Sequence, residues 1–190
     1  IEWELPESLE LQLSQSVFSL QPGVYTDVGI IYVVESGLPA GFELTPTIRL
    51  ITSDGIEMGT ISTTIEVATI IDWEIYSEYI SMDETDNITL TYTLRNIGNA
   101  DDGLDVTLST NIFAEYGLIP PISSDWEIGE WTPNHFILHD IPTDATVTFT
   151  AWMQLPSNQE LNRTATITVE MRSTLEPSII FTNRTEYEIL

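Results

Sequence analysis

Apolar and polar side chains alternate along most of this 190-residue chain, with a period of two residues. Residues 87–96 place Ile88, Leu90, Tyr92 and Leu94 on one side, and three threonines and an arginine on the other. Strict alternation is typical of half-buried β-strands, whereas a helix would repeat its apolar residues every 3.6 positions. No such helical stripe runs through the sequence, and we therefore predict an all-β fold.

Further alternating runs occupy residues 146–155 and 164–172, and turn-forming residues such as those at 53–55 (Ser-Asp-Gly) separate the runs. Residues 28–34 are almost entirely apolar, which predicts a central strand that is buried on both faces. Short strands with turns between them are typical of β-sandwiches. The fold class predicted is therefore a sandwich of short strands.

The order of these segments repeats along the chain. A Leu-Pro pair ends one predicted strand at residues 38–39 and another at 155–156, about 117 positions apart, and similar runs follow each pair. The repeat predicts two domains: residues 71–190 form a complete immunoglobulin-like β-sandwich, and residues 1–70 form the C-terminal part of a preceding one. The connection between them contains no Gly, Pro or Ser, and we expect a stiff joint.

The first copy lacks counterparts of the strands expected at 73–80, 87–96 and 104–110. An incomplete sandwich leaves sheet edges and one core face uncovered. Three explanations stay open. The missing strands precede these residues in a longer protein, another chain donates them by strand addition, or the first copy is a smaller sandwich.

Residues 94–101 read Leu-Arg-Asn-Ile-Gly-Asn-Ala-Asp and join two alternating runs. This pattern resembles a strand-turn-strand element of CARDB-type and NPCBM-associated immunoglobulin-like modules, and Trp126, residues 141–143 and residues 155–156 resemble later parts of the same module. The resemblance covers the second predicted domain well and the first in part. It implies tandem immunoglobulin-like β-sandwiches, the first one partial, which recur as spacers or adhesins on archaeal and bacterial surface proteins.

The charge is strongly one-sided, with 30 acidic residues against five arginines, no lysine, and a net charge of −25. Phosphate binding needs cations, and this balance excludes nucleic acid and anionic lipid as partners. It favours solubility in salty water, as in marine archaeal surface proteins, or the attraction of cations and basic partners. We expect no direct membrane insertion in this segment, because no apolar run approaches the ~20 residues of a span. Any leader or anchor is expected to lie outside these residues.

Three Asn-x-Thr sequons indicate an extracellular, glycosylated surface protein, with acceptors predicted at Asn87, Asn162 and Asn183. The chain has no cysteine, and neither disulfides nor thiolate metal sites contribute.

The densest acidic cluster predicts the one candidate metal site. Its members are Asn99, Asp101, Asp102 and Asp105, whose oxygens suit Ca²⁺. Asx-rich turns also arise for backbone reasons alone, and this alternative stays open. A second acidic cluster at residues 83–87 lies at the other end of a ten-residue strand and cannot share one site with the first. No cofactor is required, and Ca²⁺ is the candidate ion.

Tryptophans supply the candidate ligand site. Trp126 and Trp131 lie in the loop-rich residues 123–134 and are predicted to form a platform for carbohydrate, whereas Trp73 and Trp152 lie within strand patterns and are predicted to be core.

Catalytic signals are missing from the sequence. His135 and His139 lie four apart in a predicted strand, about 13 Å from one another, and we expect solvent-facing side chains that cannot share a metal. The chain has no nucleophile elbow, phosphate-binding glycine loop, cysteine nucleophile or zinc spacing. We predict that it is not an enzyme.

The predicted function is that of a non-catalytic structural or adhesive repeat segment in an extracellular cell-surface or appendage protein. Its partners would be other protein chains or further repeats of the same protein. Two alternatives stay open. One is a carbohydrate-binding accessory module of a secreted enzyme, and the other is a filament subunit assembled by strand donation, with residues 1–70 as the acceptor.

Overall fold

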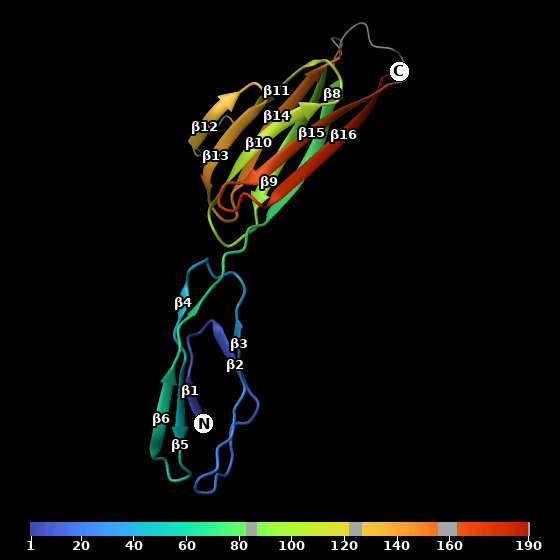
Figure 1. Cartoon of the computed structure of the whole chain (residues 1–190). Helices are drawn as coiled ribbons and strands as arrows, with labels where there is room; N and C mark the ends of the chain where they lie inside the picture. Colours follow the sequence, from blue (N-terminus) through green and yellow to red (C-terminus); the bar gives the residue numbers. More distant parts are fainter. Residues whose placement is uncertain (83–86, 122–126, 156–162, 190) are drawn as a thin grey trace. The chain divides into compact units, whose positions relative to one another are not determined.

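The computed structural model describes residues 1–82, 87–121, 127–155 and 163–189 of the chain (Figure 1). Every regular element in these ranges is a β-strand, which confirms the predicted all-β fold. No membrane-spanning helix exists among the described residues. The strands are β1 (Glu2–Glu4), β2 (Leu9–Leu13), β3 (Ile30–Val34), β4 (Glu43–Leu44), β5 (Thr47–Ile51), β6 (Glu57–Ser62), β7 (Ile65–Glu66), β8 (Trp73–Met82), β9 (Asn87–Asn96), β10 (Asp102–Thr110), β11 (Glu115–Ile119), β12 (Glu127–Thr132), β13 (His135–Ile141), β14 (Thr146–Gln154), β15 (Arg163–Ser173) and β16 (Ile180–Ile189).

The chain divides into two compact units, Ile1–Thr69 and Ile70–Leu190, which we call unit 1 and unit 2. This division lies one residue before the boundary that the sequence predicts.

Unit 2 consists of two antiparallel sheets. One has the strand order β11-β14-β9-β8 and the other has the order β12-β13-β10-β15-β16. The central pairings join strands that are distant in sequence, β9 with β14 and β10 with β15. Long-range antiparallel pairings within each of two sheets are typical of β-sandwiches.

The core of unit 2 is built from alternate residues of the strands of both sheets. On β14, Val147, Phe149 and Met153 are buried, and Phe149 stacks on Tyr92 of β9 with ring centroids 5.1 Å apart. Phe136 of the other sheet meets Phe149 edge-on at 5.3 Å. Twenty buried apolar residues of the described ranges form this one core. The alternation in the sequence is therefore satisfied by two sheets that cover one another's inner faces.

The turn after β9 is held by a buried asparagine. The side-chain nitrogen of Asn96 donates to the carbonyl oxygens of Ala100 (2.9 Å) and Ile141 (3.0 Å), and its side-chain oxygen accepts from Gly98 N (3.0 Å). A Cβ on Gly98 would collide with the carbonyl oxygen of Ile70. The Asn-x-Gly pattern is thus explained by hydrogen bonding and close backbone approach.

Unit 1 contains a three-stranded sheet β1-β5-β6 and two pairs, β2-β3 and β4-β7. The two runs β4–β5 and β6–β7 form one long hairpin, because their residue pairing keeps a single register apart from one shift beside Leu50. All of these pairings are antiparallel.

The pairings of unit 1 follow part of the scheme of unit 2. The β5–β6 hairpin corresponds to β15–β16, and β1 lies against β5 as β10 lies against β15. The expectation that no counterpart of the strand at 104–110 exists is therefore wrong, since β1 fills that place in shortened form. Among the described residues of unit 1, no strand occupies the places that β8 and β9 hold in unit 2.

The prediction for residues 28–34 is also wrong. These residues were expected to form a strand buried on both faces, but β3 has one neighbour, β2, and its Ile31 and Val33 are exposed. An apolar run is buried on both faces only where further layers cover both, and the described part of unit 1 supplies no such layer outside β3.

Tyr92 is expected to make unit 2 less stable at alkaline pH. Burial raises the pKa of Tyr92 from 10 to about 12, although a hydrogen bond with Thr185 opposes the change. The unfolded chain therefore releases this proton before the folded chain does, and stability is lost as pH rises from 10 to 12. Between pH 10 and 12, we expect the free energy of unfolding of the wild type to fall by about 2 kcal/mol more than that of Tyr92→Phe. Urea unfolding at several pH values measures the difference, and parallel curves for both proteins would contradict it.

Candidate functional site

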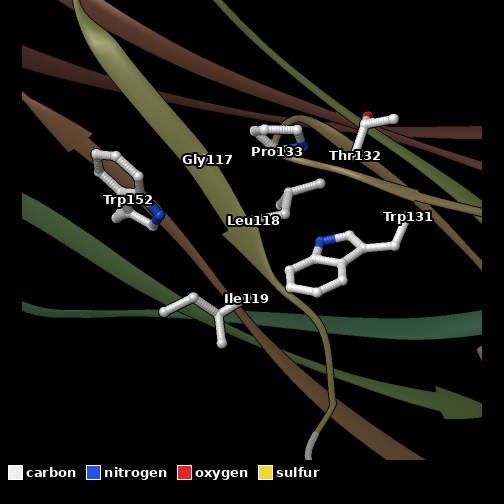
Figure 2. Close-up of a pocket in the computed structure, with 7 residues that line it drawn as sticks. All are labelled: Gly117, Leu118, Ile119, Trp131, Thr132, Pro133 and Trp152. Carbon is white, nitrogen blue, oxygen red and sulfur yellow. The ribbon is translucent and has the colours of Figure 1, made fainter.

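A groove on unit 2 opens beside β11 and β12, the edge strands of its two sheets. Its volume is about 430 Å³. Figure 2 shows Trp152 on one side and Trp131 on the other, with apolar side chains between them. The lining residues are Gly117, Leu118, Ile119, Trp131, Thr132, Pro133 and Trp152.

Alternation along β14 places the Trp152 side chain in this groove. Its neighbours Ala151 and Met153 are fully buried, and Trp152 therefore lies on the other face of the strand. Its register partner is Gly117 of β11. A Cβ on Gly117 would lie only 2.9 Å from the indole nitrogen of Trp152. The glycine therefore allows the indole to lie across the neighbouring strand.

A backbone hydrogen bond closes the floor of the groove. Leu118 N donates to the carbonyl oxygen of Pro133 over 2.6 Å, which links β11 to the turn between β12 and β13. Leu118 itself is buried. The edges of the two sheets are thus fixed to one another beneath the tryptophans.

Trp131 is the exposed wall of the groove, with 63 % of its surface open to solvent. It lies on β12, where the pairing with β13 shifts register between Ile128 and Trp131. The seven lining residues include no carboxylate, imidazole or amine. The groove can therefore bind by aromatic stacking and apolar contact, with Thr132 and the indole N–H groups as its side-chain hydrogen-bonding groups.

Of the two tryptophans predicted to form a carbohydrate platform, Trp131 lines the groove, whereas Trp126 lies outside the described residues. The platform itself stays a prediction. Trp73 is buried as predicted. The prediction that Trp152 belongs to the core is wrong, because its position on β14 alternates with the buried residues. The alternation itself was the signal that could have identified it.

The four predicted calcium ligands point to different partners. The side-chain oxygen of Asn99 accepts from Ile70 N (2.7 Å), and that of Asp101 accepts from Thr143 N (3.4 Å). Asp105 pairs with His135, and Asp102 is buried. Among the residues that the structure describes, no group of three or more acidic or histidine side chains is arranged to hold a metal ion. The structure therefore does not bring these four residues together as a cation site.

Asp102 instead joins three parts of the sandwich. One carboxylate oxygen accepts from the indole nitrogen of Trp73 (3.0 Å) on β8. The other accepts from Gly103 N (2.7 Å), from the Ser173 hydroxyl (2.9 Å) and from Leu175 N (3.1 Å). A buried carboxylate is tolerated where several donors satisfy it. The sequence did not reveal this role because three of the four donors, those of Trp73, Ser173 and Leu175, come from distant positions.

The two histidines lie on one face of β13, as their spacing predicts. His135 is half-buried, and its ring nitrogen lies 2.9 Å from the Asp105 carboxylate on the neighbouring strand β10. His139 lies beside Gly129, where an added Cβ would collide with the His139 ring. Both side chains alternate with the buried Phe136 and Leu138, and they therefore lie on the outer face of β13, where each is partly exposed.

The predicted glycosylation sites differ in position. Asn183 is half-buried on β16, where its side-chain oxygen accepts from the hydroxyls of Tyr92 (3.3 Å) and Thr185 (3.4 Å). A bulky glycan does not suit this inward-facing amide. Asn87 is half-buried at the first residue of β9, and Asn162 lies outside the described residues.

Comparisons with known proteins give little information about identity. No protein-family model matches the chain, and no curated protein matches it. One similar solved structure is the chitinase ChiA74 from Bacillus thuringiensis, with 15 % sequence identity and a TM-score of 0.21. The match covers 77 % of this chain and 21 % of that chain, so the chain spans about a fifth of the chitinase. A TM-score this low carries no argument about function.

The structure predicts that Asp102 stabilises unit 2 through its carboxylate. In Asp102→Asn, one oxygen becomes an amide donor, and either orientation of the amide then faces a donor that loses its acceptor. We expect the free energy of unfolding to fall by about 2–4 kcal/mol. Urea denaturation measures this loss.

The matched control is Asp101→Asn, the same substitution at the exposed neighbouring residue. Its expected change is within about 0.5 kcal/mol. Equal effects of the two variants would show that the buried hydrogen bonds of Asp102 are not important for stability.

Proposed function

We propose that this chain is a structural spacer segment of an extracellular surface or appendage protein, in which folded β units follow one another with almost no free linker. The observation that carries the proposal is the shortness of the connection between the two units. The strongly acidic composition supports it, because a net charge of −25 keeps such segments hydrated and apart from one another.

Backbone hydrogen bonds hold the chain almost up to the boundary on both sides. In unit 1, Val67 N donates to Phe42 O (3.0 Å), and Val67 O accepts from Gly41 N (2.9 Å). In unit 2, Ile70 N donates to the side-chain oxygen of Asn99 (2.7 Å), and Ile70 O accepts from Asn99 N (3.0 Å). Only residues 68 and 69 lie between these anchored positions.

The next residues are also engaged within unit 2. The carbonyl oxygen of Asp72 accepts from Ile97 N (3.0 Å) and Gly98 N (3.1 Å), and the side chain of Ile71 packs against the core. Flexible linkers are rich in Gly and Ser and make few such bonds. The residues beside the connection are therefore hydrogen-bonded within their own units, unlike the residues of a flexible linker.

A distance measurement between spin labels tests the spacer function. The chain has no cysteine, so Met58→Cys and Thr182→Cys place one label on each unit without background. We expect one narrow distance distribution. Inserting Gly-Ser-Gly-Ser between Ala68 and Thr69 should broaden it at least about twofold, because the inserted residues behave as a flexible coil. A wild-type distribution as broad as that of the insertion variant would contradict the proposal.

The second candidate function is carbohydrate binding, which the tryptophan groove of unit 2 favours. Trp131 and Trp152 flank an apolar surface, and flat aromatic rings of this kind stack on the faces of sugar rings (Figure 2). This function would make the chain an accessory module that holds a secreted enzyme on its substrate.

Tryptophan fluorescence tests this second function with a panel of β-linked hexasaccharides. We expect saturable quenching in the wild type and an affinity about tenfold lower in Trp131→Ala, which corresponds to the loss of one stacking contact. Trp3→Ala is the matched control, because Trp3 is a half-exposed tryptophan of unit 1. Its affinity should equal that of the wild type. Quenching that is unaffected by Trp131→Ala would exclude the groove as the binding site.

A further inference from the structure

Unit 1 contains a mostly apolar cavity of about 430 Å³ between its two main groups of strands, and Thr26, Asp27 and Thr60 are the polar side chains in its lining. Leu13 and Ile30 line it from β2 and β3, and Ile48, Leu50 and Ile61 line it from β5 and β6. These residues occupy the inner faces of the two sheets, where a closed sandwich would have its core.

These inner faces are open to solvent. Ile30 is 38 % exposed, Leu50 is 39 % exposed and Ile61 is 65 % exposed. Apart from Pro46, the buried apolar side chains of unit 1 are Leu9, Leu44 and Ile48, against twenty in the core of the described part of unit 2. Exposed apolar surface that continues into a cavity is typical of an interaction site.

The same region has an open sheet edge. The hydrogen bond from Glu35 N to Ser8 O (3.0 Å) fixes which backbone groups of β3 point toward β2. In an antiparallel pair these groups alternate, and the N–H and C=O groups of Ile30, Tyr32 and Val34 therefore point to the opposite edge. Among the described residues, no strand pairs with that edge.

Unit 2 shows what covers such an edge in a closed sandwich. Its strand β14 corresponds to β3, because each is the last strand before the long hairpin and each has an earlier strand on one side. The other side of β14 carries the hairpin β8–β9. That hairpin also covers β16, since the Tyr92 hydroxyl of β9 donates to Asn183 (3.3 Å).

We propose that unit 1 is an acceptor for an antiparallel β-hairpin of the β8–β9 kind, supplied by another polypeptide segment. One strand of this hairpin adds to β3 in antiparallel orientation, and its alternating apolar side chains fill the cavity and cover Ile30, Leu50 and Ile61. Main-chain hydrogen bonds to the open edge give affinity, and the apolar positions give specificity.

A second copy of this chain does not fit this role. Its own β9 is committed to the core of unit 2, where Ile88, Leu90 and Leu94 are fully buried. Two copies that each carry a net charge of −25 also repel one another. The occupant is therefore a hairpin of a different protein chain that is not already part of a folded core.

The test adds a candidate hairpin to the whole chain. A duplicate of residues 71–97 is fused ahead of Ile1 through a Gly-Ser linker, and amide hydrogen exchange is followed along β3. We expect exchange at Ile30, Tyr32 and Val34 to slow by about 100-fold or more, because their open edge becomes paired. Unchanged exchange would overturn the proposal. Protection that appears instead in unit 2, with release of its native β8–β9, would also overturn it.

Two aspartate substitutions in the fused chain distinguish the cavity from the outer surface. Ile61 (65 % exposed) lines the cavity, and Ile31 (60 % exposed) alternates with the cavity-lining Ile30 and lies on the other face of β3. Ile61→Asp should reduce the added protection of the β3 amides at least about tenfold, because it places a charge against apolar side chains. Ile31→Asp should leave the protection unchanged, and equal effects would contradict the assignment.

Light scattering of the unfused chain tests whether a second copy of the chain is the occupant. We expect a monomer over the accessible concentration range. A concentration-dependent dimer with protected β3 amides would assign the surface to a second copy and overturn the proposal. None of these results depends on the spacer function, whose own test is the distance distribution between the two units.

Discussion

The inner face of a β-sheet has to be covered, and this constraint governs both units of the chain. Unit 2 meets it with two sheets whose side chains enclose one core, centred on the stacked rings of Tyr92 and Phe149 and the edge-on ring of Phe136. Once those faces are fixed, every other residue of each strand is assigned to the outside. The position of Trp152 in the groove follows directly, because it alternates with buried residues of β14.

Two buried polar side chains hold the same end of unit 2. Asn96 satisfies two carbonyl groups and one amide at the turn after β9, and Asp102 satisfies four donors at the beginning of β10. Buried polar groups are stable where their hydrogen bonds are complete. A short acidic stretch that suggests cation binding is therefore used for internal hydrogen bonding, while its exposed members form separate contacts.

The exposed apolar surfaces of the two units differ in kind. The groove of unit 2 presents two tryptophans over a floor that a backbone hydrogen bond holds closed, and it suits a ligand with a flat face. The cavity of unit 1 combines inner-face aliphatic side chains with an unpaired edge of β3, and it suits a polypeptide strand. The short connection at residues 68–69 favours a structural function for the chain that carries both surfaces.

The sequence by itself determined the strand class and the inward positions of long alternating strands, because these depend on a local period of two. The repeat of segments along the chain placed a boundary near residue 70. It also indicated that the first unit lacks strands. Only the tertiary structure decided that the apolar residues 30–34 stay partly exposed, that Asp102 is buried, and that Trp131 and Trp152 line one groove. Each of these depends on partners far away along the chain. Alternation shows which residues share a face, but the covering of that face depends on which other strands pack against it.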